Sequence, residues 1–216
     1  MSRQMLVFAT GNQNKMREIR EIFNDPDLSI FSMKEFGIHP DIVEDGKSFE
    51  ENAMIKARAA AEAIPGKRRK EEGILVLADD SGLVIDALDG EPGIYSARYM
   101  GEDTPYEKKN AQLLQRLLHV PEEKRTARFV CAIAAVLPDG RTCTRTEAVE
   151  GKIAQAPAGK NGFGYDPIFI ADGYHVTTAE MKPEEKNAIS HRGKALRAMK
   201  KALEEMSSTP AEGMPS

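Results

Sequence analysis

Met5-Leu-Val-Phe-Ala-Thr-Gly-Asn-Gln-Asn-Lys15 joins an apolar run to a short polar turn, and an amphipathic segment follows it. The run from Met5 to Ala9 predicts a buried strand. From Lys15 to Phe23, apolar residues recur at helical spacing, and Asn12 or Asn14 is the candidate N-cap. A strand that turns sharply into a helix presents free backbone N–H groups at the positive end of the helix dipole. The turn is therefore a candidate phosphate site, to which Lys15 adds a full positive charge.

A second helix is predicted after Ser48. The segment Ser48-Phe-Glu-Glu51 fits a capping box, and the helical pattern ends near Pro65-Gly66. The apolar face of this helix contains Ala53, Met54, Ala57, Ala60, Ala61 and Ile64. The charged run from Lys67 to Glu72 is interpreted as a solvated loop rather than a nucleic-acid patch, because acidic residues follow the basic ones at once.

Two acidic residues follow the next apolar run. Ile74 to Ala78 predicts a strand that delivers Asp79-Asp80-Ser-Gly82 at its C-terminal end. A capping Thr104 with Pro105 at the first helical position predicts a further helix. The buried stripe of that helix would consist of Leu113, Leu114, Leu117 and Leu118.

The second half of the chain contains a predicted β-hairpin, in which Pro138-Asp-Gly140 joins the strands Phe129–Leu137 and Arg141–Val149. Tyr165 to Ala171 predicts another short strand, and a C-terminal helix is predicted from Ser190. Because strands and helices alternate in the first half and a hairpin intrudes in the second, we expect an α/β fold with a mixed sheet. Sites in such sheets tend to lie where strands end, which here means Thr10 and Asp80.

The bulk properties are those of a globular protein: 216 residues, of which 41% are hydrophobic and 30% charged. We find no internal repeat or long linker, so residues 1–206 are expected to form one domain, and residues 207–216 a disordered tail. A net charge of −4 argues against a sequence-independent grip on DNA or RNA. No signal peptide is evident and no apolar run approaches the roughly 20 residues of a membrane span, so we expect a cytoplasmic protein without a membrane partner. Cys131 and Cys143 lie too far apart for a CxxC motif and are expected to be unreactive thiols.

The acidic candidates for chemistry are Glu44-Asp45 and Asp79-Asp80. Mg²⁺ takes oxygen ligands, usually one or two carboxylates together with phosphate oxygens and waters, so two acidic turns could converge on such an ion. Alternatively, Glu44-Asp45-Gly46 is simply a turn before Ser48. Asp79 and Asp80 are harder to explain in this way, because adjacent acids repel each other unless a cation or hydrogen-bond donors relieve them.

The basic candidates are Lys15, Lys56, Lys160, Lys186, His191 and Arg192. Lys56 lies off the apolar face of its predicted helix and could be an ordinary surface lysine. His191 and Arg192 stand at a predicted helix start, where an arginine can clamp a phosphate or stack on a base and a histidine can donate to a carbonyl oxygen. A lone histidine can equally be structural.

Glycines surround two aromatic residues in Gly159-Lys-Asn-Gly-Phe-Gly-Tyr-Asp-Pro167. Such a segment lets the backbone approach a planar ring, and the aromatics offer stacking faces. Asp166 could accept a hydrogen bond from a ribose hydroxyl or a base N–H. The alternative is a tight turn with its aromatics in the core. The chain contains no GxxxxGK(S/T) loop, no GxGxxG after a strand, no HExxH and no GxSxG, so any phosphate site is of another kind.

Six segments, in order along the chain, resemble the inosine/xanthosine triphosphate pyrophosphatases, which remove deaminated purine nucleotides. They are Ala9-Thr-Gly-Asn-x-x-Lys15, Glu44-Asp-Gly-x-Ser-Phe-x-Glu-Asn-Ala53, Ala78-Asp-Asp-Ser-Gly-Leu83, Pro92-Gly-Ile-Tyr-Ser-Ala-Arg98, Gly162-Phe-Gly-Tyr-Asp-Pro167 and Ile189-Ser-His-Arg-Gly193. The segment from Pro65 to Gly73 departs from the family pattern in being longer and more basic. It lies away from the motifs, so the departure concerns only the local loop.

The resemblance implies hydrolysis of ITP, dITP and XTP to the monophosphate and pyrophosphate with Mg²⁺. It also implies a two-lobed α/β fold with a long central mixed sheet flanked by helices, a substrate cleft between the lobes, and a homodimer. Glu44 and Asp80 would hold the metal, and Asp80 would accept the proton of the attacking water. The implied substrate-binding residues are Thr10, Gly11, Asn12, Gln13, Asn14, Lys15, Lys56, Ser81, Phe163, Gly164, Tyr165, Asp166, Lys186, His191 and Arg192.

Physical chemistry agrees with these implied roles. Water attack at the α-phosphorus places charge on the phosphoryl oxygens and on the leaving pyrophosphate, which cations stabilise. Hypoxanthine and xanthine carry a 6-oxo group that donors such as His191 and Arg192 would bind, whereas the 6-amino group of adenine would leave them unpaired. Two other functions stay open: an enzyme acting on another nucleotide with the same metal chemistry, and a nucleotide-binding regulatory module without turnover.

Overall fold

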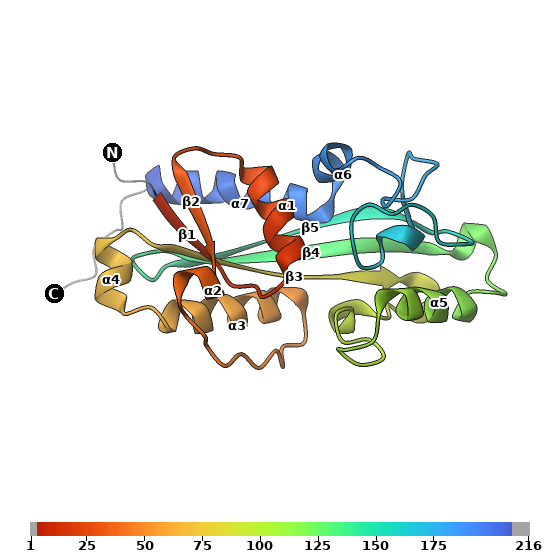
Figure 1. Cartoon of the computed structure of the whole chain (residues 1–216), viewed down its shortest axis with the longest axis horizontal. Coiled ribbons are helices and arrows are strands. Elements are labelled where there is room, and N and C mark those ends of the chain that lie inside the picture. Colours follow the sequence, from red (N-terminus) through yellow and green to blue (C-terminus); the bar gives the residue numbers. More distant parts are fainter. Residues whose placement is uncertain (1–3, 209–216) are drawn as a thin grey trace.

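The fold is built on one six-stranded mixed sheet with the strand order β2-β1-β3-β4-β5-β6 (Figure 1). The computed structural model describes residues 4–208. Strand β1 pairs in parallel with β2 and β3, and all other neighbours are antiparallel. The strands are β1 Gln4–Phe8, β2 Leu28–Ser32, β3 Leu75–Ile85, β4 Thr126–Val136, β5 Thr142–Ile153 and β6 Phe169–Ala171. The fold is therefore α/β with a mixed sheet, as the sequence predicts.

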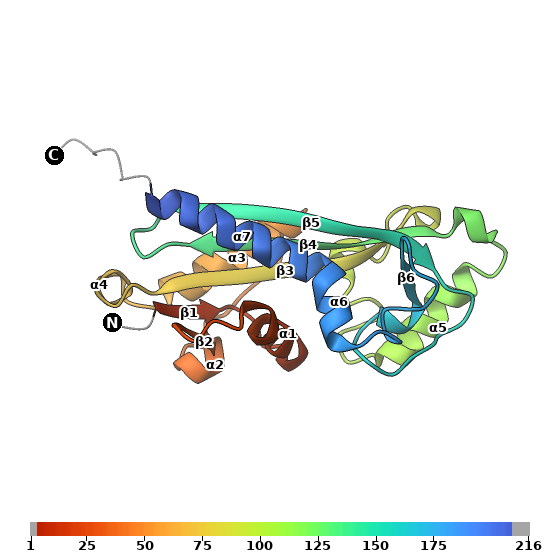
Figure 2. The same cartoon turned by 90° about the horizontal axis from the view of Figure 1, so that it is seen from above.

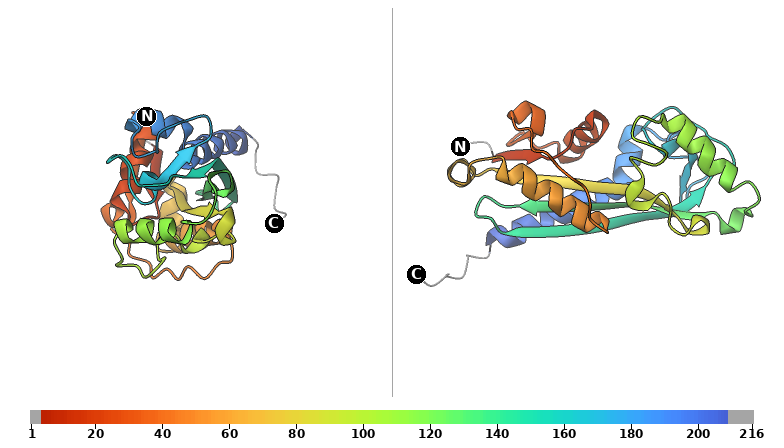
Figure 3. Two further views of the ribbon diagram at one scale, coloured as in Figure 1. Left: turned by 90° about the vertical axis from the view of Figure 1, so that its right-hand side faces the viewer. Right: turned by 90° about the horizontal axis from the view of Figure 1, so that it is seen from below.

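Three long strands, β3, β4 and β5, run along the length of the molecule (Figure 2). The helices are α1 Gln13–Phe23, α2 Met33–Phe36, α3 Phe49–Glu62, α4 Gly66–Glu71, α5 Tyr106–Arg116, α6 Pro183–Ile189 and α7 His191–Ser208. Short 3-10 helices are η1 Asp86–Leu88, η2 Gly93–Tyr95, η3 Glu122–Lys124 and η4 Asp166–Ile168. Helices α3 and α5 lie on one side of the sheet at opposite ends (Figure 3).

The strand alternation of β1 separates two hydrophobic cores. Leu6 and Phe8 face the core that α1 and α7 cover, whereas Val7 and Ala9 face the alanines of α3. A third core surrounds Leu83, Leu113 and Phe169 at the far end of the long strands. The first two cores lie on the two faces of the sheet in one lobe, and the third core forms the other lobe. The long strands β3 and β4 run through both lobes.

Several predicted elements are confirmed. Asn12 is the N-cap of α1, and its side chain accepts the N–H groups of Asn14 and Lys15. Ser48 caps α3 by accepting the N–H of Glu51, but the Glu51 carboxylate accepts the N–H of Lys47, so the predicted capping box forms only in part. The predicted hairpin is present as β4 and β5.

The sequence predicts that Asp79 and Asp80 follow the end of a strand, and this prediction is wrong. Both residues lie within β3. Strand β3 continues to Ile85, and residues 79–82 pair with residues 130–133 of β4. The apolar pattern ends at Ala78, so it does not predict that the strand continues. The two carboxylates can be buried in the strand because cations from other parts of the chain pair with them. The hydrogen-bonded partner strand extends β3 beyond its apolar part.

Other local predictions are wrong or incomplete. The run from Lys67 to Glu72 forms the exposed helix α4 over most of its length, supported by ion pairs such as Arg68–Glu72 at 3.0 Å. Thr104 does not cap α5, since its hydroxyl donates to the carbonyl of Met100. Leu118 lies beyond the end of α5 and is 66% exposed.

The sequence did not indicate β2, α2 or α6, and only residues 169–171 of the predicted strand 165–171 are extended. Helix α7 runs to Ser208, two residues into the segment predicted to be a tail, and residues 209–216 lie outside the described residues. Within residues 4–208, no helix is long and apolar enough to cross a membrane. Both cysteines are unpaired, and burial raises the pKa of the Cys131 thiol to about 12, which favours the unreactive form.

Candidate active site

A cleft of about 280 Å³ opens where the turn after β1, the middle of β3 and the start of α7 come together. It is lined by most of the residues that the sequence singles out. These are Thr10, Gly11, Asn12, Lys15, Glu44, Lys56, Asp80, Ser81, Phe163, Gly164, Tyr165, Asp166, Lys186, His191 and Arg192. Gln13 and Asn14, at the start of α1, do not line it, and neither does the exposed Lys160.

The turn between β1 and α1 reaches the cleft through Gly11. No atom lies within 4 Å of a Cβ built on Gly11, so its backbone is open to an approaching group. The Thr10 hydroxyl accepts the N–H of Asn12 at 3.1 Å, and the Asn12 side chain accepts two further N–H groups. The turn therefore offers fewer free backbone donors than its sequence suggests, and the Lys15 ammonium remains its main positive charge.

One wall of the cleft contains an acidic pair joined by a lysine. Lys56 Nζ on α3 lies 3.1 Å from Glu44 Oε2 and 3.0 Å from Asp80 Oδ1. The Asn52 amide also donates to Asp80 Oδ2 at 3.3 Å. Burial raises the pKa of Asp80 above its ordinary value, and the Lys56 charge offsets this only in part. Burial opposes the Lys56 charge, yet its carboxylate neighbours, Asp80 first, raise the pKa of Lys56.

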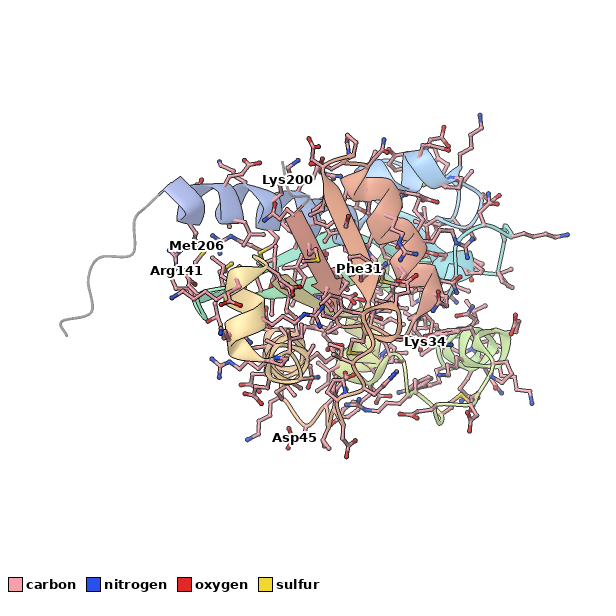
Figure 4. All side chains as sticks on the ribbon, turned by 60° about the vertical axis from the view of Figure 1, so that its left-hand side comes forward. Phe31, Lys34, Asp45, Arg141, Lys200 and Met206 are labelled. Atoms are coloured by element: carbon pink, nitrogen blue, oxygen red, sulfur yellow. The ribbon has the colours of Figure 1, made fainter. Side chains whose placement is uncertain are left out.

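The predicted convergence of Glu44 and Asp80 is thus present. Of the pair Glu44-Asp45, only Glu44 lines the cleft, and Asp45 is exposed at the outer edge of the molecule (Figure 4). Gly46 is required beside them, because a Cβ there would lie 2.7 Å from Asn52 Oδ1. The same Asn52 oxygen accepts the Gly46 N–H at 2.9 Å, which holds this segment against the start of α3.

Asp79 belongs to the opposite face of β3, as strand alternation requires. Its Oδ2 atom lies 2.9 Å from Lys15 Nζ and 3.2 Å from Arg192 Nη2, and it accepts the Ser81 hydroxyl at 3.1 Å. Burial would raise the pKa of Asp79, but the charges of Lys15 and Arg192 hold it well below its ordinary range. Asp79 therefore stays ionised as an anchor for two cations, while Asp80 faces the other acidic residue.

Glu18 connects α1 to α6 and to the start of α7 through buried ion pairs, and the sequence pattern did not single it out. Its carboxylate contacts Lys186 Nζ at 2.8 Å and the guanidinium of Arg192. Burial opposes ionisation, but these cations lower the pKa of Glu18. The signal in the sequence was its position three residues after Lys15, which places both side chains on one helix face. Its partners follow more than 160 residues later, so the pairing itself could not be anticipated.

The glycine-rich segment holds one aromatic ring in the cleft and buries another. Phe163 lines the cleft with Lys186 Nζ 5.0 Å from its ring centre. Tyr165 is buried, donates its hydroxyl to the Ser96 carbonyl at 2.7 Å and packs edge-on against Tyr106. The alternative of a turn packed into the core therefore describes Tyr165 but not Phe163.

Asp166 is committed to contacts within the protein. It accepts the Phe163 N–H at 2.8 Å, the Thr178 hydroxyl at 2.9 Å and Lys186 Nζ at 2.6 Å. Gly162 must be glycine, because its φ is +71° and a Cβ would lie 2.2 Å from Asp166 Oδ2. The carboxylate thus fixes the shape of this loop, which limits its capacity to accept a sugar hydroxyl.

His191 and Arg192 are almost fully buried at the base of the cleft. The His191 ring stacks on Phe129 with centres 4.8 Å apart, and burial lowers its pKa well below the ordinary value, so the imidazole is neutral. Arg192 Nη2 donates to Ser81 Oγ at 3.0 Å and to Asp79 Oδ2 at 3.2 Å. Its Nε atom has no hydrogen-bond partner among the described residues.

Comparison with known proteins shows that the residues of the cleft lie in the part of the chain that matches a known family. The Ham1 family model matches residues 6–202. A dITP/XTP pyrophosphatase of Geobacter sulfurreducens is 48% identical over 198 residues, which cover 92% of this chain and 96% of that protein. One from Bacillus cereus is 41% identical over 206 residues, covering 94% and 97%.

Solved structures agree with the sequence comparison. The Ham1 protein of Staphylococcus aureus superposes with a TM-score of 0.80 at 40% identity and covers 94% of this chain and 100% of its own. A nucleoside-triphosphatase, or dITP/XTP pyrophosphatase, of Mycobacterium abscessus has a TM-score of 0.69 at 39% identity and covers 91% and 98%. Every residue that lines the cleft falls within the matched range.

Proposed function

The chain belongs to the Ham1 family, and on this basis we propose that it hydrolyses deaminated purine nucleoside triphosphates to the monophosphate and pyrophosphate. The substrates are ITP, dITP and XTP, and their removal keeps them out of DNA and RNA. The observation that carries the proposal is the convergence of Glu44 and Asp80 on Lys56 beside a turn suited to phosphate. Phe163, in the aromatic loop formed by residues 162–166, also lines the cleft, and its ring suits stacking on a base.

Asp80 is the proton acceptor for the attacking water in this proposal. A carboxylate is suited to general-base catalysis when its pKa lies closer to the working pH, and burial raises the pKa of Asp80. Lys56 keeps the carboxylate oriented at 3.0 Å without neutralising the cleft, because it also binds Glu44. Asp79 is the weaker candidate, since Lys15 and Arg192 hold its charge in place.

Glu44 and Asp80 are also the residues that would hold Mg²⁺. The donor set fits this ion: two carboxylates face one another across a single ammonium group, and the remaining ligands would be phosphate oxygens and waters. Within residues 4–208, no group of three or more acidic, histidine or cysteine side chains is arranged to hold a metal ion. When bound, the ion would stabilise negative charge on the phosphoryl oxygens.

The remaining residues divide between the triphosphate and the base. Thr10, Gly11, Asn12 and Lys15 would bind the triphosphate with Lys56 and Ser81, whereas Gln13 and Asn14 would support the turn from within α1. Phe163 to Asp166 would surround the base and sugar. Arg192 has one buried guanidinium N–H without a partner among the described residues, and neutral His191 retains a ring N–H. With Lys186, these donors favour a 6-oxo over a 6-amino purine.

A nucleotide panel tests the function. Purified protein with Mg²⁺ should release pyrophosphate from ITP, dITP and XTP much faster than from ATP or the pyrimidine triphosphates, with GTP as the comparison for the 2-position. A preference for ATP or for a pyrimidine would reject this activity. Nucleotide binding without pyrophosphate release from any substrate would instead favour a regulatory module.

Lys15→Ala should weaken triphosphate binding most at low ionic strength. The variant removes a partly exposed ammonium from the phosphate turn, and salt screens the interactions of such a group. Asp79 keeps Arg192 as a partner, so the fold should survive. The Michaelis constant for ITP, measured over a range of salt concentrations, should rise most at the lowest. A constant equal to that of the wild type at every ionic strength would exclude this role.

We propose that the protein acts as a homodimer in the cytoplasm, with free nucleoside triphosphates as its substrates and with no nucleic-acid or membrane partner. Sedimentation equilibrium at micromolar concentration should give twice the chain mass, and a monomer mass at all concentrations would reject the dimer.

A further inference from the structure

The segment from Gly93 to Arg98 is held rigidly beside the cleft. The Ser96 hydroxyl accepts the Leu83 N–H at 2.9 Å and donates to the Gly93 carbonyl at 2.7 Å. Tyr165 and Lys109 donate to the carbonyls of Ser96 and Ala97 at 2.7 and 2.6 Å. Contacts from β3, α5 and the aromatic loop thus fix this backbone, so the side chain that follows is presented from a fixed position.

That side chain is Arg98, which lines the cleft and is only partly buried. Its Nη2 atom donates to the backbone carbonyl of Glu44 at 3.3 Å, and its guanidinium lies 5.0 Å from the Tyr95 ring centre. The carbonyl contact uses one of five N–H donors, and the ring contact uses none. Most of the hydrogen-bonding capacity of Arg98 is therefore available, next to a residue of the acidic wall.

Arg98 differs in charge balance from the other cations of the cleft. Lys15 pairs with Asp79, Lys56 with Glu44 and Asp80, and Lys186 and Arg192 each with Glu18 and a second carboxylate. Among the described residues that line the cleft, Arg98 is the one cation without a carboxylate at ion-pair distance. A polyanion that enters the cleft would have to compete with carboxylates for Lys15, Lys56, Lys186 and Arg192. It would meet no such competition at Arg98.

We propose that Arg98 is a further substrate-binding residue, which binds the pyrophosphate portion of the nucleotide as it enters and leaves. This inference rests on the proposed function. A planar guanidinium binds phosphate oxygens with two parallel hydrogen bonds, and the Tyr95 ring beneath it favours one orientation. The contact with Glu44 places the guanidinium beside the acidic wall of the cleft, where the metal and the phosphates would bind. Charge builds on the leaving pyrophosphate during hydrolysis, and Arg98 would stabilise it.

Product binding tests this contact directly. Arg98→Gln should weaken the binding of pyrophosphate, measured by calorimetry at fixed Mg²⁺, by at least about tenfold, since a charge-assisted contact is lost. Binding of inosine monophosphate should change less than about twofold, because the contact lies beyond the α-phosphate. The Michaelis constant for ITP should rise together with the dissociation constant for pyrophosphate. Arg98→Lys should be intermediate, since it keeps the charge and loses the planar fork; it also serves if the glutamine variant does not fold.

The control is Arg145→Gln, which removes an exposed arginine that lies outside the cleft and donates to the Thr144 carbonyl at 2.8 Å. The proposal is overturned if Arg98→Gln binds pyrophosphate as tightly as this control does. It is also overturned if both products lose affinity equally, or if only the Mg²⁺ requirement rises, because these results indicate a displaced Glu44 segment. Pyrophosphate binding needs no turnover, so the outcome is separate from that of the nucleotide panel.

Discussion

Asp80→Asn should reduce kcat for ITP by roughly 10²–10⁴-fold, the range that a positioned general base contributes. The substitution keeps the shape of the side chain and removes the group proposed to accept the proton of water. The fold should tolerate it, because burial already disfavours the charged form of Asp80 and Lys56 retains Glu44. Single-turnover measurement of pyrophosphate formation, in quenched samples with the enzyme in saturating excess over ITP and with Mg²⁺ present, isolates this step from product release.

Asp45→Asn is the matched control for Asp80→Asn. It removes the same charge from the exposed neighbour of Glu44, outside the cleft, and should leave kcat near the wild-type value. Thermal unfolding of both variants should resemble that of the wild type. An Asp80→Asn protein that is folded and retains most of its rate would show that another group accepts the proton.

Glu18→Ala should lower the free energy of unfolding by about 3–5 kcal/mol, the range for a buried ion pair that loses one partner. Glu18 is only 9% exposed and contacts both Lys186 and Arg192. Its removal leaves two buried cations with one carboxylate each, Asp166 and Asp79. Urea unfolding at neutral pH measures the loss, and a stable dimer would require comparison at equal protein concentration.

Glu21→Ala provides the comparison on the same helix. Glu21 is exposed and accepts a hydrogen bond from Asn187 at 2.9 Å, so its loss should cost less than about 1 kcal/mol. Glu18→Gln should fall between the two, since an amide can still accept hydrogen bonds without balancing the charge. Equal stabilities of the Glu18 and Glu21 variants would mean that the buried network contributes nothing net to folding.

Local sequence patterns predicted the elements whose stability is local. The caps at Asn12 and Ser48 and the turn at Pro138-Asp-Gly140 act over a few residues, and all three are present, although the capping box at Ser48 forms only in part. The error at Asp79 and Asp80 arose because pairing with β4, about 50 residues later, extends the strand through a polar segment. The short helices α2 and α6 carry too little periodic sequence to be recognised in isolation.

The sequence by itself determined the class of fold and the candidate residues, because hydrophobic periodicity and chemical type are written in the order of residues. Only the tertiary structure decided which of those residues pair with one another and which side chains face the cleft. It separates Asp79 from Asp80 by strand alternation, joins Glu44 to Asp80 through Lys56, and reveals Glu18 and Arg98 by their charge partners or the lack of them. The physical reason is that burial and charge pairing depend on contacts between residues far apart in the chain, and no local pattern records those contacts.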